Sequence, residues 1–219
     1  MQETIDTKEF LVSKDDLLNK LRAYTYTPDD QNVRYKEIIK RELLKLPELL
    51  YALHNEALEP ELFNKNGNIN VDEEGNPLGQ WDDYYGPNGN IRPFLYYPST
   101  ETESRNFVCY KIDFDELPKY GKSLKKLSEI TFMILVHGQD GIDKLTGIPR
   151  HDLIASIIRQ RFNWSSIFGM QAKLISSRES LTDNNYLTRT LVFQIEDTNG
   201  ITNTPYGDES YIQNNEYWK

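Results

Sequence analysis

The hydrophobic pattern is clearest in the second half of the chain, where four segments follow one another. Residues 130–137 form an apolar run of strand length, and residues 138–147 are rich in turn formers. Two further runs, at 171–178 and 186–196, have the length and composition of strands. Between the loop and these runs, a helix opened by Pro149 carries its apolar residues at helical spacing: Leu153, Ile154, Ile157, Ile158 and Phe162. The pattern predicts strand, helix, strand, strand.

The distribution of apolar residues over the two faces of each strand indicates how these elements pack. Residues 130–137 are apolar on both faces, which is typical of a strand in the middle of a sheet. Residues 106–114 alternate and should pair antiparallel with that strand. We therefore expect an α+β fold with a mixed or antiparallel sheet, helices packed on one face, extended hairpin loops and a C-terminal arm.

Helix signals precede this region. Ser13 and Asp16 have capping-box character before a short helix, and residues 27–30 (Thr-Pro-Asp-Asp) give a second start signal. The amphipathic pattern that follows continues to residue 53, but Pro47 lies inside it and should kink or split the helix. We expect these helices to pack on the sheet.

The remaining sequence predicts loops and an arm around one core domain. We divide the chain into an N-terminal arm and short helix (1–30), a core (31–197) and an extended C-terminal arm (198–219). Within the core, residues 59–102 form an insertion with two Asn-Gly turns, Asn66-Gly67 and Asn88-Gly89, each predicting a hairpin that projects from the body. Four aromatic residues suited to docking on a neighbouring surface lie in the C-terminal arm: Tyr206, Tyr211, Tyr217 and Trp218.

The composition and net charge argue against several classes of protein. A net charge of −9 over 219 residues argues against a surface that wraps nucleic acid, because phosphate binding needs clustered Lys and Arg. The single cysteine, Cys109, excludes an internal disulfide and lies in an apolar strand, where it is expected to be a small buried hydrophobe. The polar first ten residues do not resemble a secretory leader, and we expect no membrane-spanning segment.

The sequence contains few residues in patterns typical of catalytic or metal-binding sites. His137 and His151 flank the loop after the central strand, near Asp140, Asp143 and Asp152, and could in principle hold a metal for a hydrolase or nuclease. Their spacing matches no established metal motif, and the sequence contains neither a serine elbow nor a phosphate-binding loop. We therefore assign no catalytic, cofactor-binding or metal-binding residues and expect no enzyme. The core segment also carries five arginines, which could meet nucleic acid but are explained more simply by salt links to the surplus acids or to an adjacent copy: Arg150, Arg159, Arg161, Arg178 and Arg189.

The order of elements over residues 34–197 resembles the tail-terminator and head–tail joining (neck) proteins of tailed bacteriophages. The helix segment 149–158, Pro-Arg-His-Asp-Leu-Ile-Ala-Ser-Ile-Ile, is similar to the helix after that family's central strand. The closing strand 186–193, Tyr-Leu-Thr-Arg-Thr-Leu-Val-Phe, resembles the family's last strand, and residues 92–98 resemble its Pro-flanked aromatic strand. The 59–91 insertion and the C-terminal tail depart from the compact members.

This resemblance implies a structural protein of the virion, assembled in the host cytoplasm. It implies a homo-oligomeric ring, six-fold or twelve-fold, that joins or terminates the tail, contacts other neck or tail proteins and lets DNA pass without sequence-specific binding. The arm aromatics and the turn residues Asn66, Gly67, Asn88 and Gly89 are the expected interface. The alternatives are a metal-dependent hydrolase or nuclease and a small cytosolic adaptor that binds one protein partner.

Overall fold

The computed structural model describes residues 13–25, 31–98, 104–116, 125–182 and 185–198. The chain divides into two units, one of residues 35–199 and the other of residues 1–34 and 200–219. The second unit contains α1 (Lys14–Thr25), which begins with the expected cap because the Ser13 hydroxyl oxygen accepts a hydrogen bond from the Asp16 backbone N–H. The start signal at residues 27–30 lies outside the described residues.

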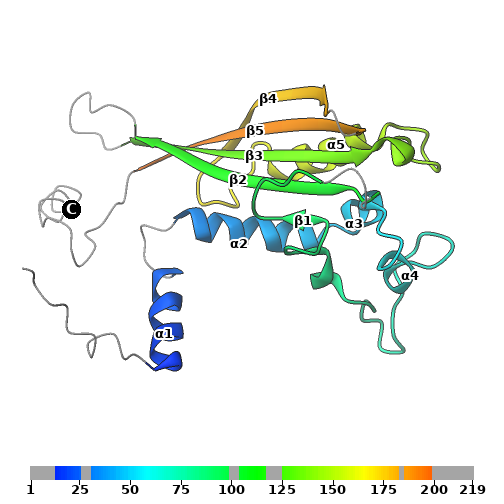
Figure 1. Ribbon diagram of the computed structural model, residues 1–219, viewed down its shortest axis with the longest axis horizontal. Coiled ribbons are helices and arrows are strands. Elements are labelled where there is room, and N and C mark those ends of the chain that lie inside the picture. Colours follow the sequence, from blue (N-terminus) through cyan, green and yellow to red (C-terminus); the bar gives the residue numbers. More distant parts are fainter. Residues whose placement is uncertain (1–12, 26–30, 99–103, 117–124, 183–184, 199–219) are drawn as a thin grey trace, which may run out of the picture. The chain divides into compact units, whose positions relative to one another are not determined.

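The larger unit contains a five-stranded mixed sheet in the order β1-β2-β3-β5-β4 (Figure 1). The short β1 pairs with β2 in parallel, and the other three pairs are antiparallel. In chain order, the elements of this unit are α2 (Gln31–Leu44, which begins in the preceding unit), α3 (Pro47–Leu53), α4 (Glu59–Leu62), η2 (Trp81–Tyr84), β1 (Ile91–Arg92), β2 (Phe107–Glu116), β3 (Lys125–His137), η3 (Gly138–Asp140), α5 (Arg150–Phe162), β4 (Ala172–Leu181) and β5 (Tyr186–Thr198). The α+β class and the central position of β3 are confirmed.

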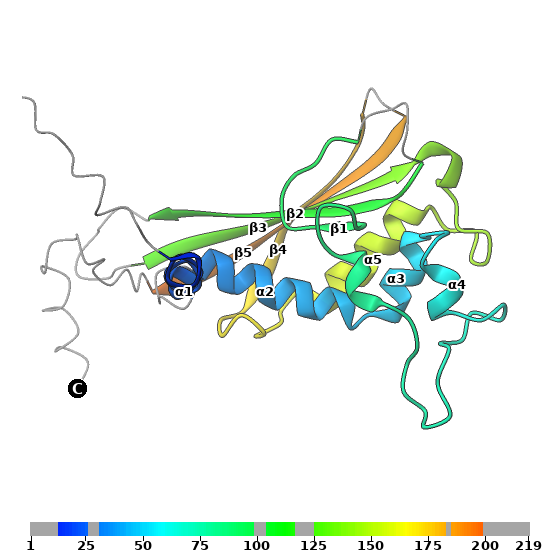
Figure 2. The ribbon, with the colours of Figure 1, turned by 60° about the horizontal axis from the view of Figure 1, so that its bottom comes forward.

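The helices α2, α3 and α5 cover one face of the sheet, as expected (Figure 2). Phe132 lies at the centre of this core, with its ring 5.1 Å from Phe162 of α5 and 5.7 Å from Phe193 of β5. The proline break is also confirmed, since α2 ends at Leu44 and α3 starts at Pro47. A break there turns the chain, so that the buried residues of both helices face the same sheet.

The opposite face carries a small second cluster at one end of the sheet. It contains Phe107, Cys109, Leu135 and Tyr186, with Tyr96 packed against it. The expectation of a buried Cys109 is confirmed. The expected aromatic strand over residues 92–98 is wrong, since the strand here is only Ile91–Arg92. Tyr96 instead places its ring 5.3 Å from that of Phe107.

The two Asn-Gly turns differ from each other. The first reverses the chain between Phe63 and Ile69, stands in solvent and belongs to loops that extend away from the sheet (Figure 2). The second does not project from the body as expected. Gly89 is buried against the Tyr84 backbone, and the following Asn90 is fully buried. A turn that packs against the body in this way holds the loop in place.

Candidate functional site

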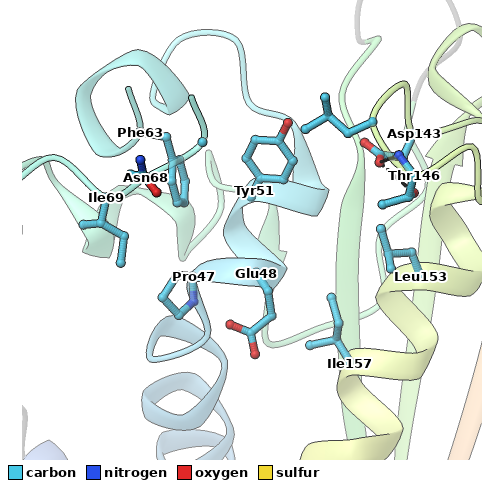
Figure 3. A pocket seen from close by; sticks show the side chains of 12 residues that line it. Pro47, Glu48, Tyr51, Phe63, Asn68, Ile69, Asp143, Thr146, Leu153 and Ile157 are labelled. Carbon is cyan, nitrogen blue, oxygen red and sulfur yellow. Dashed lines mark hydrogen bonds between the residues drawn. The ribbon is translucent and has the colours of Figure 1, made fainter. Parts of the chain in front are cut away.

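An apolar hollow of about 670 Å³ lies between α3, α5, the first Asn-Gly turn and the loop of residues 142–149 (Figure 3). We call it the α3–α5 pocket. Leu153 and Ile157 of α5 form one side, and Phe63 and Ile69 flank the turn on the other. These positions follow from helical spacing, because residues four apart lie on the same helix face. The pocket offers shape and apolar surface, which suits a contact with another molecule.

Several polar side chains also line this pocket, among them Asp143, Thr146, Glu48 and Asn68. Burial favours the neutral form of Asp143, but hydrogen bonds from the Thr146 hydroxyl and backbone N–H, together with the charge of Arg150, hold its pKa below the ordinary value. Burial, followed by the charges of Glu59 and Asp143, raises the pKa of Tyr51 across the pocket. Asp143 is therefore a charged carboxylate already bound within its own loop, which leaves it poorly placed to accept a substrate proton.

Arg150, the first residue of α5, anchors the loop behind the pocket. Its side chain is almost fully buried, with Nη2 3.4 Å from Asp143 Oδ1 and Nε 3.2 Å from Asp140 Oδ2. Nη1 donates to the Ala52 carbonyl at 3.0 Å. Asp140 in turn accepts from the amide of Asn106, which also donates to the Leu53 carbonyl. This network ties the end of α3 to the start of β2 and of α5.

Three large aliphatic side chains stand in solvent on this anchored loop. Leu145, which also lines the α3–α5 pocket, is 74% exposed, Ile142 is 63% exposed and Ile148 is 43% exposed. We call them the 142–148 patch. Large apolar residues gathered on one exposed loop beside a hollow are typical of a contact surface.

The structure does not bring together His137 and His151, the two histidines on which the metal-site alternative depended. His137 ends β3 on the face opposite α5 and packs edge-on against Tyr186, with ring centroids 5.3 Å apart. His151 belongs to the first turn of α5. Its Nε2 atom lies 3.4 Å from Glu179 Oε1 and 3.7 Å from Asp152 Oδ1. Alternation along β3 explains the separation, since Val136, not His137, faces the helices.

The carboxylates beside His151 already have a cationic partner. Arg189 Nη2 lies 2.5 Å from Asp152 Oδ1 and 3.1 Å from Glu179 Oε2. His151, Asp152 and Glu179 are the one group of three potential metal ligands in the part of the chain that the structure describes, but a metal ion there would have to displace the guanidinium. Salt links within the chain were expected for the arginines, and they are confirmed for Arg150, for Arg189 and for Arg161, which pairs with Glu42.

Comparison with known families adds one finding. The model of the YomW family matches residues 45–195, well over half of the chain and nearly all of the larger unit. The chain belongs to the YomW family. This family is phage-derived, which agrees with the phage resemblance at the coarse level and says nothing about tail terminators in particular. No curated protein matches the chain.

The YomW match contains the pocket, the 142–148 patch and four of the expected interface residues. Asn66 and Gly67 are exposed at a turn tip, and Gly67 and Asn68 line the α3–α5 pocket, whereas Gly89 is buried and only Asn88 of the second turn is exposed. Tyr206, Tyr211, Tyr217 and Trp218 lie outside the described residues and beyond the match. None of the described helices is long and apolar enough to span a membrane.

Neither the α3–α5 pocket nor the 142–148 patch was expected from the sequence. The pocket is built by segments separated by up to 110 residues, so no local pattern could reveal it. The patch could have been recognised in the sequence, because Ile142, Leu145 and Ile148 are aliphatic residues in a loop otherwise rich in Gly, Asp and Thr. Aliphatic residues in a turn-rich loop are either buried or available for contact.

Proposed function

We propose that this YomW-family protein is a structural component of a phage particle, a ring-forming subunit at the neck or tail end through which DNA passes. The observation that carries the proposal is the distribution of exposed apolar side chains in the larger unit, which lie on loops and on the edge strand β4 around the sheet-and-helix body. Such a body holds contact surfaces in place for neighbouring subunits.

Two further observations support the proposal. The family is phage-derived, and the order strand, strand, helix, strand, strand is the one expected of tail-terminator and head–tail joining proteins. A closed ring built from heterologous contacts requires two different surfaces on each subunit. The exposed strand β4, which is partly basic, offers one such surface, and the apolar 142–148 patch offers a further surface for another subunit or another particle protein. Fold likeness alone would be a weak argument for function.

A metal-dependent hydrolase is the alternative from a different class, favoured by the grouping of His151 with Asp152 and Glu179. It predicts that purified protein retains zinc or another divalent metal after dialysis and that His151→Ala removes it. A monomeric adaptor is the other alternative, and it predicts one subunit mass at every concentration.

The test is the mass of the full-length chain across a concentration series, by light scattering and mass photometry, followed by negative-stain microscopy. We expect closed rings of one defined subunit number, either alone or after addition of the neighbouring tail or portal protein. A monomer that assembles under neither condition would overturn the proposal. Truncation after Gly200 tests the arm separately: it should leave the fold intact and weaken assembly, and unchanged assembly would remove the arm from the proposed interface.

A further inference from the structure

We propose that neighbouring copies in this ring join through their sheets, with β4 of one copy adding as an antiparallel strand to the free part of β2 of the next. The inference deepens the proposed function and depends on it, because it names the surface that joins two copies. It rests on three observations: two open sheet edges, the direction of the strands and the charge of each edge.

The first open edge is β4 (Ala172–Leu181), the last strand of the sheet. It pairs with β5 along one side. On the other side the backbone of Ala172 bonds to Trp164 and Ser165, and the Leu174 N–H donates to Asn163 Oδ1, so the open part of β4 is residues 175–181, which no described strand covers. Its residues are largely exposed, including Lys173, Ile175 and Arg178. An edge of this length presents a row of backbone N–H and C=O groups that another strand can pair with.

The second open edge belongs to β2 (Phe107–Glu116). β1 covers only Val108 and Cys109, and beyond them residues 110–116 have no strand on that side in the described part of the chain. Both edges are therefore long enough for a ladder of several residues, comparable to a typical strand. Strand addition of this kind obtains its affinity from main-chain hydrogen bonds and its specificity from the side chains beside them.

The strand directions allow β4 of one copy to pair with β2 of the next when both copies have the same orientation. β2, β3, β5 and β4 alternate in direction across the sheet, because each neighbouring pair is antiparallel. With four alternating strands, β4 runs opposite to β2. Copies placed side by side in the same orientation, as rotation about a ring axis requires, then bring β4 against an antiparallel β2. A sheet with an odd number of alternating strands would present a parallel junction.

The charges of the two edges are complementary. β4 carries Lys173 and Arg178, and its only acid, Glu179, is already bound to Arg189. The sequence of the open part of β2 contains three acids and one lysine; Asp113 is exposed there and pairs with that lysine, Lys111, at 2.6 Å, so the strand keeps a surplus of acids over bases. Opposite charges facing one another across two strands stabilise the pair, and like charges destabilise it.

The same features work against pairing of β4 with a second β4. Two β4 edges would bring their bases together, and like charges across two strands destabilise the pair. Bases on an edge strand discourage pairing with a like edge and leave an acidic strand as the favoured partner. A head-to-tail contact results, which closes into a ring when the rotation between copies permits.

Mixed cross-linking tests the pairing directly. Two single-cysteine chains, Arg178→Cys and Asp113→Cys, are prepared in a Cys109→Ala background, mixed, assembled and treated with a flexible bismaleimide. We expect a covalent dimer from the mixture and little from either chain alone. Glu74→Cys, exposed on a turn away from both edges and outside the 142–148 patch, is the matched control and should give no dimer with either partner.

A charge swap is the second measurement and needs no cysteine. Arg178→Glu should raise the concentration at which rings form by roughly tenfold, and Asp113→Lys in the same chain should reverse most of that loss. Rings that form normally but give no mixed cross-link, or a dimer from Arg178→Cys alone, would overturn the β4–β2 contact and leave the ring proposal standing. A chain that forms no ring under any condition would instead overturn the proposed function.

Discussion

Arg150 and Ala52 are joined by a hydrogen bond across 98 residues of sequence, from the guanidinium Nη1 to the carbonyl oxygen at 3.0 Å. The same guanidinium holds Asp140 and Asp143, so one buried side chain connects the end of α3 with the loop under the α3–α5 pocket. The carbonyl of Ala52 lies near the end of a short helix, where carbonyl groups lack partners within the helix.

Replacing this side chain should destabilise the whole domain. We expect Arg150→Ala to lower the free energy of unfolding by about 3 kcal/mol, because it removes the cation beside the buried Asp143 and the part-buried Asp140 and leaves the Ala52 carbonyl without its donor. Arg150→Lys should recover little, since an ammonium cannot reproduce the planar fork that reaches three groups at once. Urea unfolding followed by circular dichroism measures both.

Arg159 on the same helix provides the control. It is exposed, and the hydrogen bond that it makes is to Ser156 one turn away. Arg159→Ala should change the free energy of unfolding by less than about 0.5 kcal/mol. Equal losses for Arg150→Ala and Arg159→Ala would contradict the role assigned to the network.

The fall of the free energy of unfolding at acidic pH should also report on the loop that carries Asp143. The pKa of Asp143 is lowered in the folded protein, although burial opposes this, by hydrogen bonds from Thr146 and the charge of Arg150. Glu42 has a lowered pKa for a similar reason: burial opposes the charged form, but Arg161, Lys45 and Arg41 favour it. A lowered pKa contributes stability that is present above the ordinary value and is lost as the pH falls through the folded value.

We therefore expect the free energy of unfolding to fall as the pH drops below the ordinary values of 3.8 and 4.5. Asp143→Asn should be less stable at neutral pH and should show a shallower fall in this window. Urea titrations at several pH values between neutrality and strong acid measure the slope. A variant with the same pH slope as the parent chain would show that Asp143 does not contribute to it.

The sheet and α5 could be predicted from sequence because burial of one face leaves a period in the residues. Leu187, Arg189 and Leu191 alternate toward the helices as expected, and Arg189 meets Asp152 at the rim of the core. The ends of the strands were less predictable. β3 begins at Lys125, five residues before its apolar run, since a ladder can continue through polar residues once its register is set.

The loops and the candidate surface could not be predicted in the same way. Asn90 donates to the Asn106 carbonyl and accepts from Asn55, and none of these three residues lies near another in sequence. An asparagine beside a glycine predicts a turn whether it is buried or exposed. The two Asn-Gly turns therefore looked alike in sequence, and their surroundings in the fold decide that one projects and the other packs.

This difference between the turns is measurable. At Gly89 a Cβ would lie 2.4 Å from the Tyr84 carbonyl oxygen, so Gly89→Ala requires the backbone to move. We expect it to cost about 1–3 kcal/mol, as overpacking of a buried site does. Gly67→Ala meets no neighbour within 4 Å but has a φ of 79°, so it should cost about 1 kcal/mol through local strain alone. Thermal unfolding of both variants gives the comparison, and a larger loss at Gly67 would contradict this packing.

Cys109 offers a test of the second apolar cluster. It is fully buried, and burial raises the pKa of its thiol to about 11, an effect only partly opposed by a hydrogen bond and the charge of Arg92. The native protein should therefore react with a thiol reagent at pH 8 far more slowly than the urea-unfolded chain. Rapid labelling under native conditions would mean that this end of the sheet opens readily.

A substitution in the 142–148 patch should weaken assembly without changing the stability of the fold. Leu145 is 74% exposed, so Leu145→Ser removes almost no buried apolar area and should leave the free energy of unfolding within about 0.5 kcal/mol of the parent chain. If the patch contacts another subunit or another particle protein, the same variant should assemble less well, because that contact would lose the apolar area it buries. Val71→Ser, also more than half exposed but away from the patch, is the matched control. Assembly is measured by mass photometry with and without the neighbouring tail or portal protein. Equal assembly of Leu145→Ser and Val71→Ser would show that the patch is not a contact surface.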